Sequence, residues 1–191
     1  AVFVLMVAAP GAMGDPQTLV AWGGTLGPRT TNGEWWRLVT SMFVHDGFLY
    51  LAVNVVCLAQ LGFILERLVG PVAFVSAYMA SGVCAGISSL AIYPLAVSGG
   101  ASGGIFGIFG LLLAASIWGM RSSSNVAIPL AALKRLGPTA GVFILCNMAG
   151  GGLETLPEVV GLLVGLVYGV TLTRGIVDRK PAIRRVATVM T

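Results

Sequence analysis

A single serine set among glycines is the first place where this sequence could do chemistry. The stretch AVSGGASGGIFGIFG, residues 96–110, carries Ser102 inside a segment that is too apolar for an ordinary loop of a soluble protein. A serine hydroxyl attacks a carbonyl carbon only when a positioned base accepts its proton. The chain has one histidine, His45, and Glu158 lies at the start of its last apolar stretch. Ser102 is therefore a nucleophile, the remnant of one, or a small residue where two helices touch.

Three more polar residues stand close together in HDGFLYLAVN, at the head of another apolar stretch: His45, Tyr50 and Asn54. Polar side chains inside a membrane are costly and suggest function by default. Each also has a structural explanation, because neighbouring backbone groups could satisfy His45 and an interhelical hydrogen bond could satisfy Asn54. The residues alone leave both interpretations open.

Composition assigns these residues to a membrane protein. The 191 residues are 57% hydrophobic and 9% charged, with a mean hydropathy of +0.93, whereas a soluble domain carries about 25% charged residues. The 27 glycines suit closely packed transmembrane helices. Cys57, Cys84 and Cys146 have no metal-ligand or redox spacing, so we expect buried thiols, no metal site and no cofactor.

The apolar stretches predict an all-α integral membrane protein with a bundle of six transmembrane helices. We expect residues 1–9 to be the end of a truncated first span whose start precedes the sequence. The fifth of the six spans is shorter than the roughly 20 residues that a full crossing needs. Residues 1–173 would form the bundle, and residues 174–191 a basic C-terminal tail. The five later spans are Phe48–Leu65, Val72–Leu95, Ser102–Met120, Leu136–Gly150 and Pro157–Thr173.

Basic residues divide unevenly between the two sides that six spans would create. One side has only Arg29 and Arg37, and by the positive-inside rule the other side, with both termini, is the cytoplasmic type. The bacterial inner membrane is the default, and an organelle membrane is the alternative. The tail would touch anionic lipid or stay solvated, and no nucleic-acid motif accompanies it. The side of the termini holds nine of the eleven basic residues: Arg67, Arg121, Lys134, Arg135, Arg174, Arg179, Lys180, Arg184 and Arg185.

The connection at residues 10–44 is long for a loop without a role. It holds GEWWRLVTSMF, in which Trp35 and Trp36 suit the membrane interface and Arg37 suits contact with headgroup phosphates. An interfacial anchor explains this cluster without any chemistry.

Two of the predicted helices carry glycines at a spacing that leaves one face smooth. Ser102 introduces the first helix and Glu158 introduces the second. Small residues allow two backbones to approach closely. We therefore predict that these helices pair and that Ser102 and Glu158 face one another. The glycines are Gly100, Gly103, Gly104, Gly107 and Gly110 in the first stripe, and Gly161, Gly165 and Gly169 in the second.

The motifs GEWWRLVTSMFVHDGFLYLAVN, LERLVG, GASG and VVGLLVGLVYG, in this order, resemble the rhomboid family of intramembrane serine proteases. The resemblance implies a six-helix bundle with a water-filled cavity open to the non-cytoplasmic side. Ser102 of GASG would hold the nucleophile's position. An oxyanion site would form from the Ser102 backbone N–H, Asn54 and a histidine, beside Gly100 of GASG. His45 matches the first of two histidines in the family's pattern.

Two departures from that pattern decide the predicted function. Tyr50 replaces the second histidine, and Glu158, three residues before Gly161, replaces the histidine that serves the family as general base. Members of a catalytic unit act together, so losing one of them costs several orders of magnitude in rate. A carboxylate can act as a general base, but one buried deeply enough to keep its proton at neutral pH would be idle.

We therefore predict a rhomboid-like pseudoprotease that binds transmembrane segments of partner proteins within the bilayer without cleaving them. One alternative is an active intramembrane serine endopeptidase that uses Ser102 with Glu158. The other is a structural subunit of a larger membrane complex. In the family, helices enter beside the second and fifth spans, and a partner helix would do so here.

Overall fold

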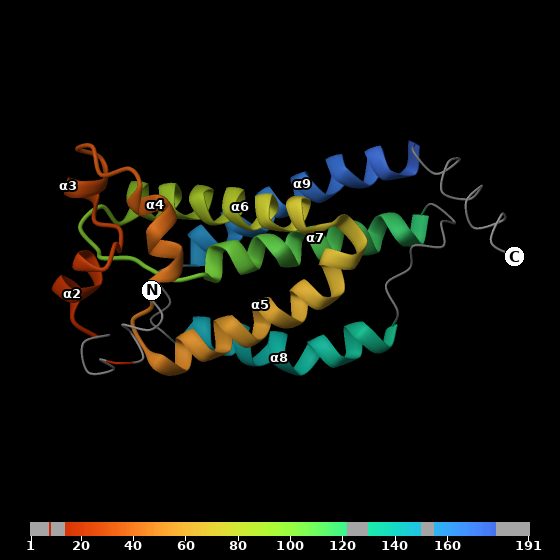
Figure 1. Ribbon diagram of the computed structural model, residues 1–191, viewed down its shortest axis with the longest axis horizontal. Helices are drawn as coiled ribbons and strands as arrows, with labels where there is room; N and C mark the ends of the chain where they lie inside the picture. Colours follow the sequence, from red (N-terminus) through yellow and green to blue (C-terminus); the bar gives the residue numbers. More distant parts are fainter. Residues whose placement is uncertain (1–7, 9–13, 122–129, 150–154, 179–191) are drawn as a thin grey trace, which may run out of the picture.

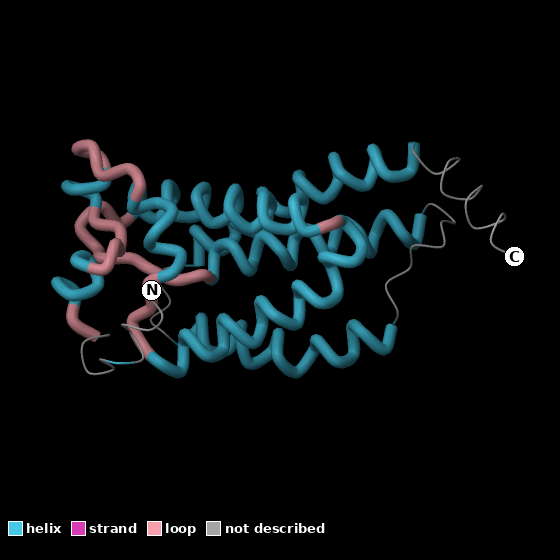
Figure 2. The backbone as a smooth tube through the Cα atoms, in the orientation of Figure 1, coloured by secondary structure: helices cyan, strands magenta, loops and turns pink. Residues whose placement is uncertain are grey.

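The computed structural model describes residues 8, 14–121, 130–149 and 155–178, and this part of the chain is an all-α bundle (Figure 1). Loops gather mainly at one end of the bundle, around the short helices that precede the long ones (Figure 2). The all-α membrane bundle expected from the apolar stretches is confirmed. The long helices are α5 (Phe48–Val69), α6 (Pro71–Ile92), α7 (Ser102–Arg121), α8 (Leu130–Ala149) and α9 (Thr155–Asp178).

Length and apolar composition qualify several of the described helices as membrane spans. Phe48–Val69, Pro71–Ile92 and Thr155–Leu172 are long and apolar enough to cross a bilayer, and α7 is apolar over Ser102–Ile117. The expected first span, apart from residue 8, lies outside the described residues. α9 continues to Asp178, and the rest of the expected tail lies outside them as well.

The fifth expected span, Leu136–Gly150, was placed wrongly at its start. α8 begins at Leu130 and has 20 residues, so it is as long as a full crossing requires. The sequence hid this start because Lys134, Arg135 and Pro138 all argue against the first turns of a membrane helix. The helix includes Pro138 in its interior, as membrane helices tolerate where neighbouring groups satisfy the freed backbone.

A cap of short helices, residues 14–47, closes the end of the bundle where α5, α7 and α9 begin (Figure 1). Trp35 and Trp36 are 70% and 42% exposed on this cap, as expected of interfacial residues. Asp15 caps the first of its helices by accepting a hydrogen bond from the Thr18 N–H at 2.9 Å. The elements of the cap are α2 (Pro16–Ala21), α3 (Gly27–Thr30), α4 (Arg37–Thr40) and the 3-10 helix η2 (Ser41–Phe43).

The two glycine stripes meet, as their spacing predicted, and bring α7 and α9 into backbone contact. A methyl group on Gly161 would overlap the carbonyl oxygen of Gly103, and one on Gly165 would overlap that of Gly107. A methyl group on Gly110 would overlap the carbonyl oxygen of Leu162. Neither helix has room for a side chain along this line, so the contact fixes how far the helices can slide or rotate.

α8 packs against α5, and its Phe143 inserts among aromatic side chains of α7. Phe143 is fully buried, and its ring centroid lies 5.2 Å from that of Phe106 and 5.9 Å from that of Phe109, both on α7. On the other side of the bundle, the Ser76 and Tyr168 hydroxyls share a 2.5 Å hydrogen bond between α6 and α9. α8 therefore has fewer partners than the helices of the glycine contact.

Replacement of Gly165 by alanine tests the glycine contact. We expect Gly165→Ala to lower the free energy of unfolding by about 1–3 kcal/mol, because overpacking of a tight contact costs that much. Gly141→Ala on α8 is the matched control, since nothing lies within 4 Å of the added methyl group there. Unfolding in detergent micelles measures both variants. Equal stability of the two would contradict the described contact.

Candidate functional site

The turn that precedes Ser102, residues 93–101, is held by the cap through backbone hydrogen bonds. The Thr25 N–H donates to the Ser98 carbonyl oxygen at 2.8 Å, and the Ser98 N–H donates back to Thr25 at 3.0 Å. The Gly27 N–H donates to the Pro94 carbonyl oxygen at 2.9 Å. A turn next to the membrane must have its backbone groups satisfied by protein. The cap therefore supplies the partners that let this turn present Ser102.

Gly99 and Gly100, near the end of the turn, lie where a side chain would be crowded or strained. The Gly100 N–H donates to the Ser41 carbonyl oxygen at 2.9 Å. A methyl group on Gly99 would lie 2.9 Å from the Val44 carbonyl oxygen. Gly100 has a φ of +133°, a conformation that residues with side chains rarely adopt. These two glycines are thus required by the geometry of the turn that leads into α7.

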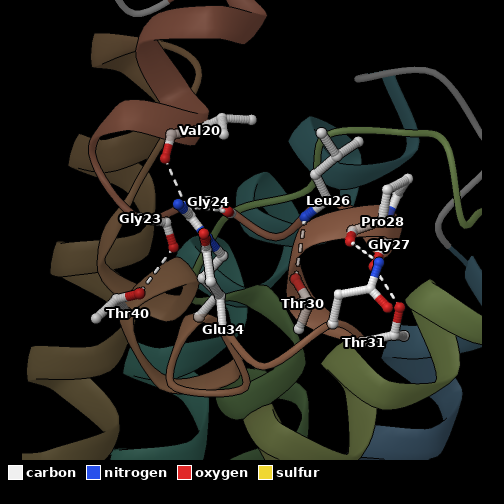
Figure 3. A network of polar contacts seen from close by, with 12 residues as sticks. Val20, Gly23, Gly24, Leu26, Gly27, Pro28, Thr30, Thr31, Glu34 and Thr40 are labelled. Atoms are coloured by element: carbon white, nitrogen blue, oxygen red, sulfur yellow. Dashed lines mark hydrogen bonds and ion pairs between the residues drawn. The ribbon is translucent and has the colours of Figure 1, made fainter.

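A buried arginine organises the cap from within. Arg37 is 4% exposed and donates from Nη1 to the carbonyl oxygens of Val20 at 2.5 Å and Gly24 at 3.0 Å. Its Nε donates to the Glu34 carboxylate, and its guanidinium lies 4.6 Å from the centre of the Trp36 ring. Figure 3 shows Val20, Gly24 and Glu34 converging in this network. The expectation that Arg37 meets lipid phosphates is wrong, because its side chain is buried and its Nε and Nη1 donate to partners inside the cap.

Ser102, Gly100 and Glu158 line one small cavity at the capped end of the bundle. The cavity has a volume of about 40 Å³, which is enough to hold a water molecule. Ser102 is 7% exposed, and Glu158 is half-buried. Ser102 and Glu158 therefore line the same cavity, and that their side chains face one another stays a prediction. The other lining residues are Thr25, Ser41, Met42, Gly82, Ala85, Gly86, Ser89, Ser98, Gly99, Gly103 and Pro157.

Two helix N-termini meet at this cavity, and both favour negative charge there. Ser102 is the first residue of α7, and Glu158 lies in the first turn of α9. The first N–H groups of a helix have no partner within the helix, and they form the positive end of its dipole. Such groups can stabilise a carbonyl oxygen on which negative charge develops. The arrangement thus offers a hydroxyl, a carboxyl group and backbone donors within one enclosure.

The residues expected on the oxyanion side, other than Gly100, do not line the cavity. Asn54 is buried on α5, its Nδ2 donates to the Tyr50 carbonyl oxygen at 2.7 Å, and its Oδ1 has no donor among the described residues. The Tyr50 ring lies 3.3 Å from the position that a methyl group on Gly100 would take. The Tyr50 hydroxyl donates to Oδ1 of Asn147 at 2.6 Å. Tyr50 therefore joins the turn before Ser102 to α8.

His45 is a buried, neutral residue beside Tyr50. The two ring centroids are 5.9 Å apart, and His45 is 1% exposed. Burial lowers the pKa of His45 to about 4, although a hydrogen bond with the Phe43 backbone opposes part of that shift. The imidazole therefore carries no charge at neutral pH. Its ring packs against Tyr50 in the segment between η2 and α5.

Some residues of the site escaped the sequence analysis. Asn147 gave the same signal as Asn54, an amide within an apolar stretch, and could have been found by it. No sequence signal pointed to the three loop residues Thr25, Ser41 and Ser98. Hydroxyl side chains are common in loops, and the role of these three depends on contacts with residues distant in the sequence. Among the described residues, no group of three or more His, Cys, Asp or Glu side chains could hold a metal ion.

Comparison with known families gives a match that covers more than half of the chain. The family model of the Rhomboid domain matches residues 32–176 of this chain. The chain belongs to the rhomboid family. The match covers the second half of the cap and all the long helices, including the turn that carries Ser102.

Several rhomboid relatives are similar over much of this chain. The Rhomboid protease GluP of Bacillus subtilis is 32% identical over 83% of this chain and 29% of its own length. The Putative rhomboid protease YdcA of the same species is 42% identical over 43% of this chain and 42% of its own length. The RHOMBOID-like protein 7 of Arabidopsis thaliana is 32% identical over 73% of this chain and 40% of its own length. The chain thus spans less than half the length of each of these relatives.

The titration of His45 can be isolated, because this rhomboid sequence has no other histidine. The pKa of His45 is about 4 in the folded chain, whereas that of an exposed histidine is about 6.5. Between these pH values His45 therefore binds a proton in the unfolded chain and stays neutral in the folded chain. We expect His45 to lower the free energy of unfolding by about 2 kcal/mol between pH 7 and pH 5. Denaturant unfolding at the two pH values measures this change.

The control for this prediction is the difference between variants. His45→Gln should lack the histidine's share of the pH dependence, whereas Asp46→Asn, at the exposed neighbouring position, should keep it. An identical pH dependence in the wild type and His45→Gln would contradict a neutral, buried His45.

Proposed function

We propose that this rhomboid is a pseudoprotease, which binds transmembrane helices of other proteins without cleaving them. The observation that carries the proposal is the pair of groups at the cavity. Ser102 shares it with Glu158, whereas the family resemblance calls for a histidine at that position. The only histidine, His45, does not line the cavity and packs beside Tyr50. Ser102 therefore lacks the imidazole that would accept its proton.

An active Ser102–Glu158 endopeptidase is the second candidate, favoured by the cavity that the two residues share. Against it stands the chemistry of a carboxylate, which lacks the second ring nitrogen through which a histidine is held in one orientation.

The proposed binding face lies at α5 and α8, beside which the resemblance places the entry of helices. α8 is held by α5 and the Phe143 cluster, whereas α7 and α9 are locked by backbone contact. Apolar side chains on both helices are exposed, among them Phe63 and Leu145. A partner would thus be another transmembrane helix, alone or within a membrane complex, and not a nucleic acid. A purely structural subunit remains the third candidate.

We further propose that the capped end faces the non-cytoplasmic side of a bacterial inner membrane, with an organelle membrane as the alternative. The end of α5 and the start of α8 lie at the opposite end of the bundle and carry Arg67, Lys134 and Arg135. At the capped end, Arg37 is neutralised by Glu34, so Arg29 is the free cation among the described residues there. Both features fit the positive-inside rule.

A fluorophosphonate probe tests the chemistry of Ser102. Phosphonylation needs the same activation of the hydroxyl as acyl transfer, so we expect labelling of the wild type no stronger than that of Ser102→Ala. In-gel fluorescence of the protein in native membranes measures it. Strong labelling that disappears in both Ser102→Ala and Glu158→Gln would establish the endopeptidase instead.

Photocrosslinking tests the binding of a partner helix. A photoreactive residue at Phe63 or Leu145, which are 74% and 66% exposed on α5 and α8, should capture a full-length membrane protein. The matched controls are Ile87 on α6 and Val167 on α9, exposed positions on other helices that should capture little. Mass spectrometry identifies the products. A partner truncated within its span would refute the proposal, and capture only at the control positions would favour the structural subunit.

A further inference from the structure

We propose that Tyr50 is a positioning residue that couples the placement of α8 to the turn carrying Ser102. Its hydroxyl reaches α8, where it donates to Oδ1 of Asn147 at 2.6 Å. Its ring lies against Gly100, two residues before Ser102. One side chain thus contacts both α8 and the turn that leads to Ser102.

The α8 end of this connection is held in one orientation. Asn147 donates from Nδ2 to the Phe143 carbonyl oxygen at 2.7 Å, so its Oδ1 is directed away from its own helix axis toward Tyr50. Phe143 is fully buried against Phe106 and Phe109 of α7. The acceptor that Tyr50 uses is therefore anchored as long as α8 keeps this packing, and it moves when α8 moves.

The other end of the connection is the backbone of Gly100. Its N–H donates to the Ser41 carbonyl oxygen at 2.9 Å, and its φ of +133° is a conformation that residues with side chains rarely adopt. A methyl group on Gly100 would already lie 3.3 Å from the Tyr50 ring, so the ring limits how far this backbone can swing. Tyr50 is itself tied down, because its carbonyl oxygen accepts from Asn54 Nδ2 at 2.7 Å.

Loss of the bond to Asn147 would let the Tyr50 ring rotate away from Gly100 and free the turn. The conformation of the turn at the Ser102 cavity therefore depends on the position of α8, whether or not Ser102 reacts. This inference deepens the proposed function, and it rests on that function only for the identity of the helix that would displace α8. The coupling itself depends on the contacts of Tyr50 alone.

Amide hydrogen exchange of residues 99–103 tests the coupling in the protein without any partner. A net hydrogen bond contributes an amount that corresponds to about three- to tenfold in an opening equilibrium. We expect Tyr50→Phe and Asn147→Leu each to accelerate exchange in this segment by about that factor. The double variant should equal the single ones, because both substitutions remove the same bond. Asn147→Asp keeps an acceptor and should exchange close to the wild type.

The matched control is Tyr168→Phe, which removes the same hydroxyl from another interhelical bond, that to Ser76 between α6 and α9. It should leave residues 99–103 unchanged. Wild-type exchange at residues 99–103 in Tyr50→Phe would overturn the inference. Equal acceleration by Tyr168→Phe, or acceleration spread through the interior of α7, would also overturn it, because it would indicate general loosening. Failure of the crosslinking experiment would leave this result intact, so the two proposals can fail separately.

Discussion

The direct contact between the backbones of α7 and α9 is the constraint on which the rest of the structure depends. Gly161 and Gly165 face the carbonyl oxygens of Gly103 and Gly107 with no side chain between them. A contact of this kind allows one relative height for the two helices, because any slide brings a larger residue into the line. The first turns of both helices, with Ser102 and Glu158, are therefore presented at the same level.

The cap satisfies the backbone hydrogen bonds of the turn that enters α7. A turn that enters a buried helix at the edge of a membrane exposes backbone groups that lipid cannot satisfy. Thr25, Gly27 and Ser41 provide partners for that turn, and Arg37 holds the loop segment that carries Thr25. The arginine charge is offset within the cap by Glu34 and by carbonyl oxygens. The polar network is thus a scaffold for the turn rather than a lipid anchor.

What the sequence could predict here depends on regular spacing. Glycines every four residues gave the pairing of α7 and α9, and apolar runs gave the long helices, since both signals are local and periodic. The start of α8 was missed because charged residues and Pro138 occupy its first turns. The hydrogen bond from Arg37 to Val20 joins residues that are 17 positions apart in the sequence, and the bond from Tyr50 to Asn147 joins residues that are 97 positions apart. No local pattern records such pairs, because they exist only once the helices are placed.

The residue that contributes a carboxyl group to the cavity, Glu158, is not one of the glycines that hold α7 and α9 together. Glu158 lies one turn before Gly161, at the cavity and outside the line of backbone contact. A change of side chain there alters the charge and proton affinity that face Ser102, while the helices meet as before. Chemistry and packing are thus carried by different residues of α9, Glu158 and Gly161, so a substitution can vary one of them and leave the other as it is.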